Sequence, residues 1–155
     1  AEQTAKLMNQ LGTEGHYTVT PEMKAKMADF CGGFATEAED AAAIRELYDE
    51  TGYVIDTHTG VASAVYQQYK KNTGDETKTV IASTASPYKF SRSVMEAISD
   101  EKLPEDEFAV IDELCRVSGV EIPKAVEEIR NAQIRHKLEC DVQDMKKTVA
   151  KILGI

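Results

Sequence analysis

Two short apolar runs that end in polar residues decide the fold of this chain: YVIDTHT at 53–59 and TVIASTASP at 79–87. Each carries the β-branched residues that are typical of strands, and an amphipathic stretch at 60–71 separates them. The small residues Gly60, Ala62, Ser63 and Ala64 keep the first turn of this predicted helix thin, which allows close approach to a sheet or a ligand. This order predicts a βαβ unit with parallel strands and a right-handed crossover. Parallel strands end at the same edge of a sheet, so the two polar ends are expected to lie together, where open α/β folds bind ligands.

The sequence on both sides of this unit predicts helices. A capping box at 36–39 (TEAE) opens a helix before the first strand. Alternating apolar residues at 134–140 predict a further short strand, and Asp141 is expected to cap a last helix whose apolar face points inward. We therefore predict an α/β fold, mostly helical and three-layered around a small parallel sheet, as a single domain over residues 1–155.

The composition argues against several classes of protein. The net charge of −9 disfavours nucleic-acid binding, which needs clustered Lys and Arg. No apolar run approaches the length that spans a membrane, and no signal-peptide pattern is present. The spacing of Cys31, Cys115 and Cys140 matches no zinc site, so we expect no metal. The three cysteines are expected to be buried free thiols in a reducing cytoplasm.

The polar residues after the two predicted strands are the candidate site. Asp56 is interpreted first as a helix cap, with a general base or a metal ligand as the alternatives, and Thr57 and Thr59 are interpreted as further cap candidates. His58, in the same turn, is either solvated, packed in the core or catalytic. Thr84 ends an apolar strand, where its hydroxyl either contacts a ligand or closes a local turn. Lys89 follows the break at Pro87 and reads by default as a surface lysine.

Two classes of function fit this pattern. The first is a receiver-like signalling domain, with Asp56 as phosphoacceptor and Thr84 as the hydroxyl at the next strand end. It conflicts with the helical pattern of the first fifty residues, where a receiver needs a strand ending in acidic residues. A non-catalytic α/β binding module is a related alternative. The second class is a part of an α/β enzyme that handles a cofactor.

Two strings in the sequence favour the second class. GYVIDTHTGVA at 52–62 resembles the G-Y-x-I-D-P-H-T-A-V-A segment of threonine synthases. VIASTASPYKF at 80–90 resembles the T-A-x-P-x-K-F segment of the same family. The run from Phe30 to Glu39 and the Arg135-His136 pair also agree in order and spacing. The resemblance covers essentially the whole chain.

The resemblance implies a pyridoxal-phosphate enzyme of the tryptophan-synthase-β-like fold (fold type II). Such enzymes convert O-phosphohomoserine and water to threonine and phosphate. It implies that Thr84 lies against the pyridine nitrogen of the cofactor. It also implies a pocket lined by Ser83, Ser86, Lys89, Asp56 and His58. Ser86 stands where the family often has His, and Thr57 stands where it usually has Pro.

The resemblance also implies that part of the enzyme lies outside this sequence. The family's Schiff-base lysine belongs to an S-x-N-S-x-N-type segment, and its cofactor phosphate sits in a Gly/Asn-rich loop. Both belong upstream, and no lysine here has that context. We therefore expect this chain to be the C-terminal part of a threonine synthase, without a catalytic residue of its own. Its partner is then the N-terminal portion of the same enzyme, and the chain alone is expected to be inactive.

Overall fold

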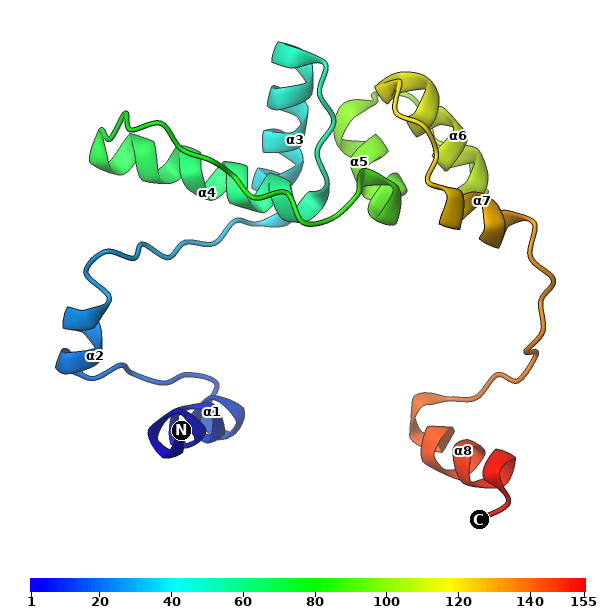
Figure 1. The fold of residues 1–155 in the computed structure, drawn as a ribbon, viewed down its shortest axis with the longest axis horizontal. Coiled ribbons are helices and arrows are strands. Elements are labelled where there is room, and N and C mark those ends of the chain that lie inside the picture. The colour runs from blue at the N-terminus through cyan, green and yellow to red at the C-terminus, as the bar shows by residue number, and fades with distance from the viewer.

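The computed structural model describes all 155 residues as helices joined by irregular segments, with no strand. A central body is built from the middle of the chain, and an arm extends from each end of it (Figure 1). The elements are α1 (Glu2–Glu14), α2 (Pro21–Lys26), α3 (Glu37–Thr51), α4 (Thr57–Thr73), η1 (Pro87–Phe90), α5 (Ser91–Ile98), α6 (Glu107–Ser118), α7 (Lys124–Arg130), η2 (Val142–Asp144) and α8 (Met145–Leu153). Helices α1 and α2 form the N-terminal arm, and α8 lies at the end of the C-terminal arm.

Local signals set the ends of the two helices that carry the site. Thr36 accepts a hydrogen bond from the Glu39 backbone N–H, and the Glu39 carboxylate accepts one from the Thr36 N–H, at 2.7 Å. This capping box, which the sequence predicted, begins α3. Helices α3 and α4 end at Gly52 and Gly74, whose φ angles of 71° and 69° favour glycine.

The core lies between α3, α5 and α6. Helix α3 packs against α4 and α5, and α5 packs against η1 and α6. Two residues of the first predicted strand, Val54 and Ile55, are buried in this core although no strand forms. The core cluster consists of Ile44, Val54, Ile55, Tyr88, Val94, Met95, Ala97, Ile98, Val110, Ile111 and Leu114.

The predicted parallel sheet is absent, so the α/β part of the fold prediction is wrong for this chain. Residues 75–85 make no backbone–backbone hydrogen bond, and the 53–55 segment does not pair with them. Val80, which the prediction placed in a strand, is 93% exposed. Two strands without further neighbours are marginal in water, which explains why these sequences form no ladder here.

Three further expectations differ from the structure. Residues 134–140 form no strand and are all exposed, with Ile134 at 75% and Leu138 at 73%. Cys31 and Cys140 are exposed rather than buried, and only Cys115 is partly covered. The apolar face of the last helix points to solvent, with Val149 53% and Ile152 61% exposed. Residues 134–140 and α8 lie in the C-terminal arm, away from the core, so their apolar side chains find no cover. Cys31 lies beside Val65 and Tyr69 of α4 but stays exposed.

The helix crossing of α3 and α4 depends on Gly60. The sequence predicted a thin first turn for this helix, suited to close approach. A Cβ atom at Gly60 would lie 2.1 Å from Asp40 Oδ1 and 2.8 Å from Ile44 Cγ1, both on α3. The close neighbour is therefore a helix, where the sequence suggested a sheet or a ligand.

We expect Gly60→Ala to lower the free energy of unfolding by about 1–3 kcal/mol, because the added methyl overpacks against Ile44. Urea unfolding followed by far-UV circular dichroism measures this change. Gly12→Ala in α1 is the matched control, since a Cβ there meets no atom within 4 Å. Equal stability of Gly60→Ala and the unmodified chain would show that α3 and α4 can separate without cost.

Candidate functional site

Asp56 is the buried centre of the candidate site. It precedes α4, and its Oδ1 accepts the backbone N–H groups of His58 at 2.9 Å and Thr59 at 3.3 Å. The residue has 0% exposure. The interpretation of Asp56 as a helix cap is confirmed. A carboxylate enclosed in this way is not presented to a phosphodonor, so the receiver-like alternative is not favoured.

A hydroxyl network joins the two polar segments that the sequence singled out. The Thr59 hydroxyl donates to Asp56 Oδ2 at 2.5 Å, and its oxygen lies 2.9 Å from Ser83 Oγ. The Ser83 hydroxyl reaches the same carboxylate oxygen at 3.4 Å. We call these three residues the Asp56–Thr59–Ser83 cluster. The ends of the two apolar runs therefore meet as predicted, although no sheet brings them together.

The cluster controls the charge state of Asp56. Burial raises the pKa of this carboxyl, but hydrogen bonds from the Thr59 hydroxyl and from the His58 and Thr59 N–H groups outweigh it. The net result is a pKa below the usual value. Asp40, across the helix crossing, has a raised pKa because of its burial and, next, the nearby charge of Asp56. Its Oδ1 is buried without a hydrogen-bond partner.

His58 lies on the solvent side of this cluster, beside Asp56. Its ring centroid is 5.1 Å from that of Phe90, and its Nδ1 is 3.6 Å from Asp56 Oδ1. The imidazole side chain is 59% exposed. This contact brings the second motif, which contains Phe90, against the first turn of α4 at a second point.

The remaining predicted site residues lie on the surface beside the cluster. Thr84 is exposed and its hydroxyl makes no hydrogen bond, so it does not close a local turn. Ser86 caps η1, because its Oγ accepts the Tyr88 N–H at 3.3 Å. The Lys89 ammonium lies 5.3 Å from the Phe90 ring centroid and is also exposed.

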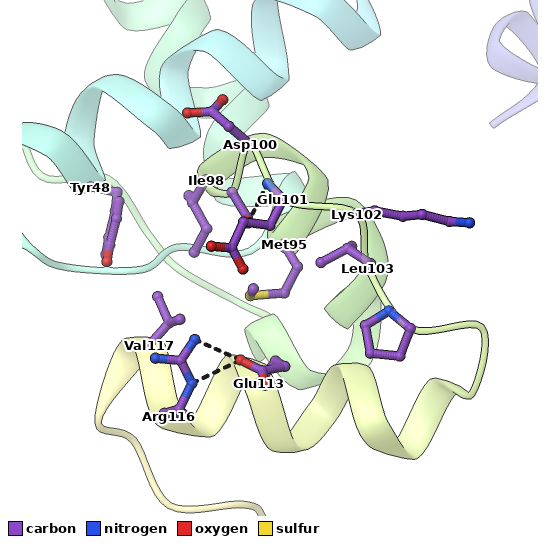
Figure 2. A pocket seen from close by; sticks show the side chains of 12 residues that line it. Tyr48, Met95, Ile98, Asp100, Glu101, Lys102, Leu103, Glu113, Arg116 and Val117 are labelled. Carbon is purple, nitrogen blue, oxygen red and sulfur yellow. Dashed lines mark hydrogen bonds and ion pairs between the residues drawn. The ribbon is translucent and has the colours of Figure 1, made fainter.

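A separate cavity of about 470 Å³ lies between α3, α5 and α6 (Figure 2). Arg116 pairs with Glu113 at 2.8 Å across its wall, and Asp100 pairs with Arg45 of α3. Lys102 points away from it. None of the predicted site residues lines this cavity, so it is distinct from the candidate site.

Comparison with known proteins places the second motif in a defined family. The family described as "Threonine synthase, C-terminal" matches residues 59–149, more than half of the chain. This chain belongs to that family. The match includes Thr59, Ser83 and Thr84, whereas Asp56 and His58 lie just before it.

Individual relatives agree with this assignment. The chain is 34% identical over 101 residues to a threonine synthase of Schizosaccharomyces pombe, which covers 64% of this chain and 20% of that protein. It is 31% identical over 101 residues to threonine synthase-like 1 of Homo sapiens, covering 64% of this chain and 13% of the relative. The chain thus spans a fifth or less of these curated relatives.

A solved structure shares the fold. The PLP-bound threonine synthase from Brucella melitensis superposes with a TM-score of 0.52 at 24% identity, over 77% of this chain and 24% of that one. At this identity the likeness supports the fold alone. The chain thus corresponds in fold to about a quarter of the length of the solved protein.

Sequence reasoning missed two residues of the site. Thr59 was interpreted only as a further helix cap, yet it bridges the carboxylate and Ser83. Asp40 was not singled out, although the small residues around Gly60 signalled that a neighbour approaches there. Asp40 could have been found by asking which residue of the preceding helix lies opposite Gly60.

The depressed pKa of Asp56 predicts a loss of stability in acid. The ionised carboxylate contributes stability that is fully present above the unfolded pKa of 3.8 and is lost as the pH falls through the lower folded pKa. We expect Asp56→Asn to cost about 1–3 kcal/mol at neutral pH and this difference to shrink in acid. Urea unfolding at a series of pH values measures it.

Asp40→Asn is the contrasting variant for this titration. The raised pKa of Asp40 means that its ionised form opposes folding above the unfolded value of 3.8. Removing this charge is therefore expected to stabilise the chain at neutral pH, with the gain disappearing in acid. The same sign of effect for both variants would contradict the assigned pKa directions.

Proposed function

We propose that this chain supplies the C-terminal part of a threonine synthase, which converts O-phosphohomoserine and water to threonine and phosphate with pyridoxal phosphate. The observation that carries the proposal is the Thr84 hydroxyl. It is exposed, makes no hydrogen bond, and follows directly the cluster that unites the two family motifs. Ligand sites contain a few polar groups held in place to contact the ligand, and the Thr84 hydroxyl is available for such a contact.

The residues present fit one side of the cofactor. The unpaired Thr84 hydroxyl has a proton to donate, and a pyridine nitrogen is an acceptor for it. A neutral hydroxyl leaves that nitrogen unprotonated, whereas a carboxylate would hold a proton on it. The cofactor, when bound, supplies the electron sink for the reaction. Ser86, Lys89, Ser83 and His58 are proposed to line the pocket, whereas the buried Asp56 supports it by holding Ser83 and Thr59.

The proposed partner is the N-terminal portion of the same enzyme, which would supply the covalent lysine and the phosphate-binding loop. Large apolar side chains that nothing in this chain covers support this proposal. Phe30 is 77% exposed, Phe34 80% and Val80 93%. Apolar exposure on this scale is typical of an interaction surface. The chain alone is proposed to be inactive.

Two observations concern the compartment in which the protein works. All three cysteines are free, as a reducing compartment would keep them. No helix is both long and apolar enough to cross a bilayer. We propose the cytoplasm as the compartment.

We expect Thr84→Val in the complete enzyme to lower turnover roughly tenfold to hundredfold. Valine keeps the size of the side chain and removes one hydrogen bond to a group that gains charge during the reaction, worth roughly 1.5–3 kcal/mol. Steady-state kinetics with O-phosphohomoserine measures the change.

Thr79→Val is the matched control for this substitution. Thr79 lies in the same irregular segment, and its hydroxyl donates only to the neighbouring Thr77 carbonyl, at 3.0 Å. We expect this variant to keep wild-type turnover. Full activity of Thr84→Val would remove Thr84 from the cofactor wall and leave the proposed function without its main support.

We expect the isolated chain to form no specific covalent adduct with pyridoxal phosphate. Its exposed lysines, Lys89 among them, lack the sequence context of the family's covalent lysine. Mass spectrometry after borohydride reduction measures labelling, with the complete enzyme as the positive control. Stoichiometric labelling of one lysine in the isolated chain would place a covalent anchor within these residues.

A further inference from the structure

We infer that Ser83 is a positioning residue, tied to Asp56 and Thr59, that fixes the backbone from which Thr84 projects. The inference deepens the proposed function and rests on it for the identity of what Thr84 contacts. One part of the inference, that Ser83 holds the segment in place, depends only on hydrogen bonds within this chain.

The segment that leads to Thr84 is tied to the rest of the fold by hydrogen bonds at two places only, of which the first is its start, where the Tyr69 hydroxyl donates to Asp75 at 2.9 Å. Residues 75–85 make no backbone–backbone hydrogen bond. Within 78–85, the Thr79 hydroxyl bonds only to its neighbour Thr77, at 3.0 Å. Ser83 makes the hydrogen bonds from this stretch to the rest of the fold, at 2.9 Å to Thr59 and 3.4 Å to Asp56.

Residues 74–83 run back along α4, and their extended path makes the hydrogen bonds of Ser83 more important. From Thr59 to Gly74 the chain advances about 22 Å along α4, at about 1.5 Å per residue. The stretch from Gly74 to Ser83 must cover the same distance in nine residues, or about 2.5 Å per residue, against about 3.3 Å for a full strand. The stretch is therefore largely extended along α4 (Figure 1), and an extended chain without a ladder depends on its end points.

The anchor itself is rigid. Asp56 has 0% exposure and Thr59 6%. Two backbone N–H groups of the first turn of α4 hold the carboxylate through Oδ1, which leaves Oδ2 for the hydroxyls. Ser83, by contrast, is exposed. Its loss should therefore free the Thr84 segment without unfolding the body.

The first test uses this chain alone. Backbone ¹⁵N relaxation gives the order parameters of residues 82–86 in the unmodified chain and in Ser83→Ala. We expect values near those of rigid backbone, about 0.85, to fall below about 0.6 in the variant. Thr79→Ala is the matched control, because it removes a hydroxyl with only a local partner, and it should leave residues 82–86 unchanged. Unchanged order in Ser83→Ala would overturn the inference.

The second test uses the complete enzyme. We expect Ser83→Ala to lower kcat about threefold to tenfold, the effect of one ordinary hydrogen bond, with KM changed less than about twofold. Ser83→Thr keeps the hydroxyl and should restore kcat and order together, which a loss of packing alone would not do. Wild-type kcat in Ser83→Ala, with Thr84→Val impaired, would overturn the positioning role. A failure of the proposed function is recognised separately, by wild-type turnover in Thr84→Val.

Discussion

The carboxylate of Asp56 is the interaction on which the site depends. It accepts two backbone N–H groups of α4, the Thr59 hydroxyl and the Ser83 hydroxyl. The backbone bonds begin the helix, and the hydroxyl bonds attach a segment that lies more than twenty residues further along the chain. One buried charge therefore sets both a secondary-structure boundary and a tertiary contact. Its burial is tolerated because hydrogen bonds compensate it.

The same arrangement explains the opposite behaviour of Asp40. The two carboxyl groups face the thin start of α4 from different elements, but only Asp56 has donors around it. Asp40 keeps one buried oxygen without a partner and has a raised pKa. Ionising both groups places like charges near each other at low solvent access. Where α3 and α4 cross, the fold therefore stabilises the ionised form of Asp56 and disfavours the ionised form of Asp40.

The local parts of this fold were predictable from sequence, and the long-range parts were not. The Thr36 capping box, the Asp56 cap and the meeting of the two polar segments follow from residue types and spacing. The sheet does not form because a strand needs a partner strand, and the segments that contain Val54 and Val80 have none in this chain, although Val54 itself is buried in the core. Cys31, Cys140 and the apolar face of α8 were expected to be buried because they lie among apolar residues. Apolar periodicity indicates that a face is buried, but it does not show whether the residues that cover it belong to the same chain.

The uncovered stretch that ends at Ser83 affects how readily copies of this chain aggregate. Residues 78–82 combine a nearly extended backbone, unpaired amide and carbonyl groups and the exposed side chain of Val80. These are the properties of an open strand edge, which adds strands from any chain that offers them. At high concentration, copies of this chain are expected to pair through these residues and aggregate. Lys78, at the start of the stretch, is the single charged residue within it and provides the only electrostatic barrier there to such growth.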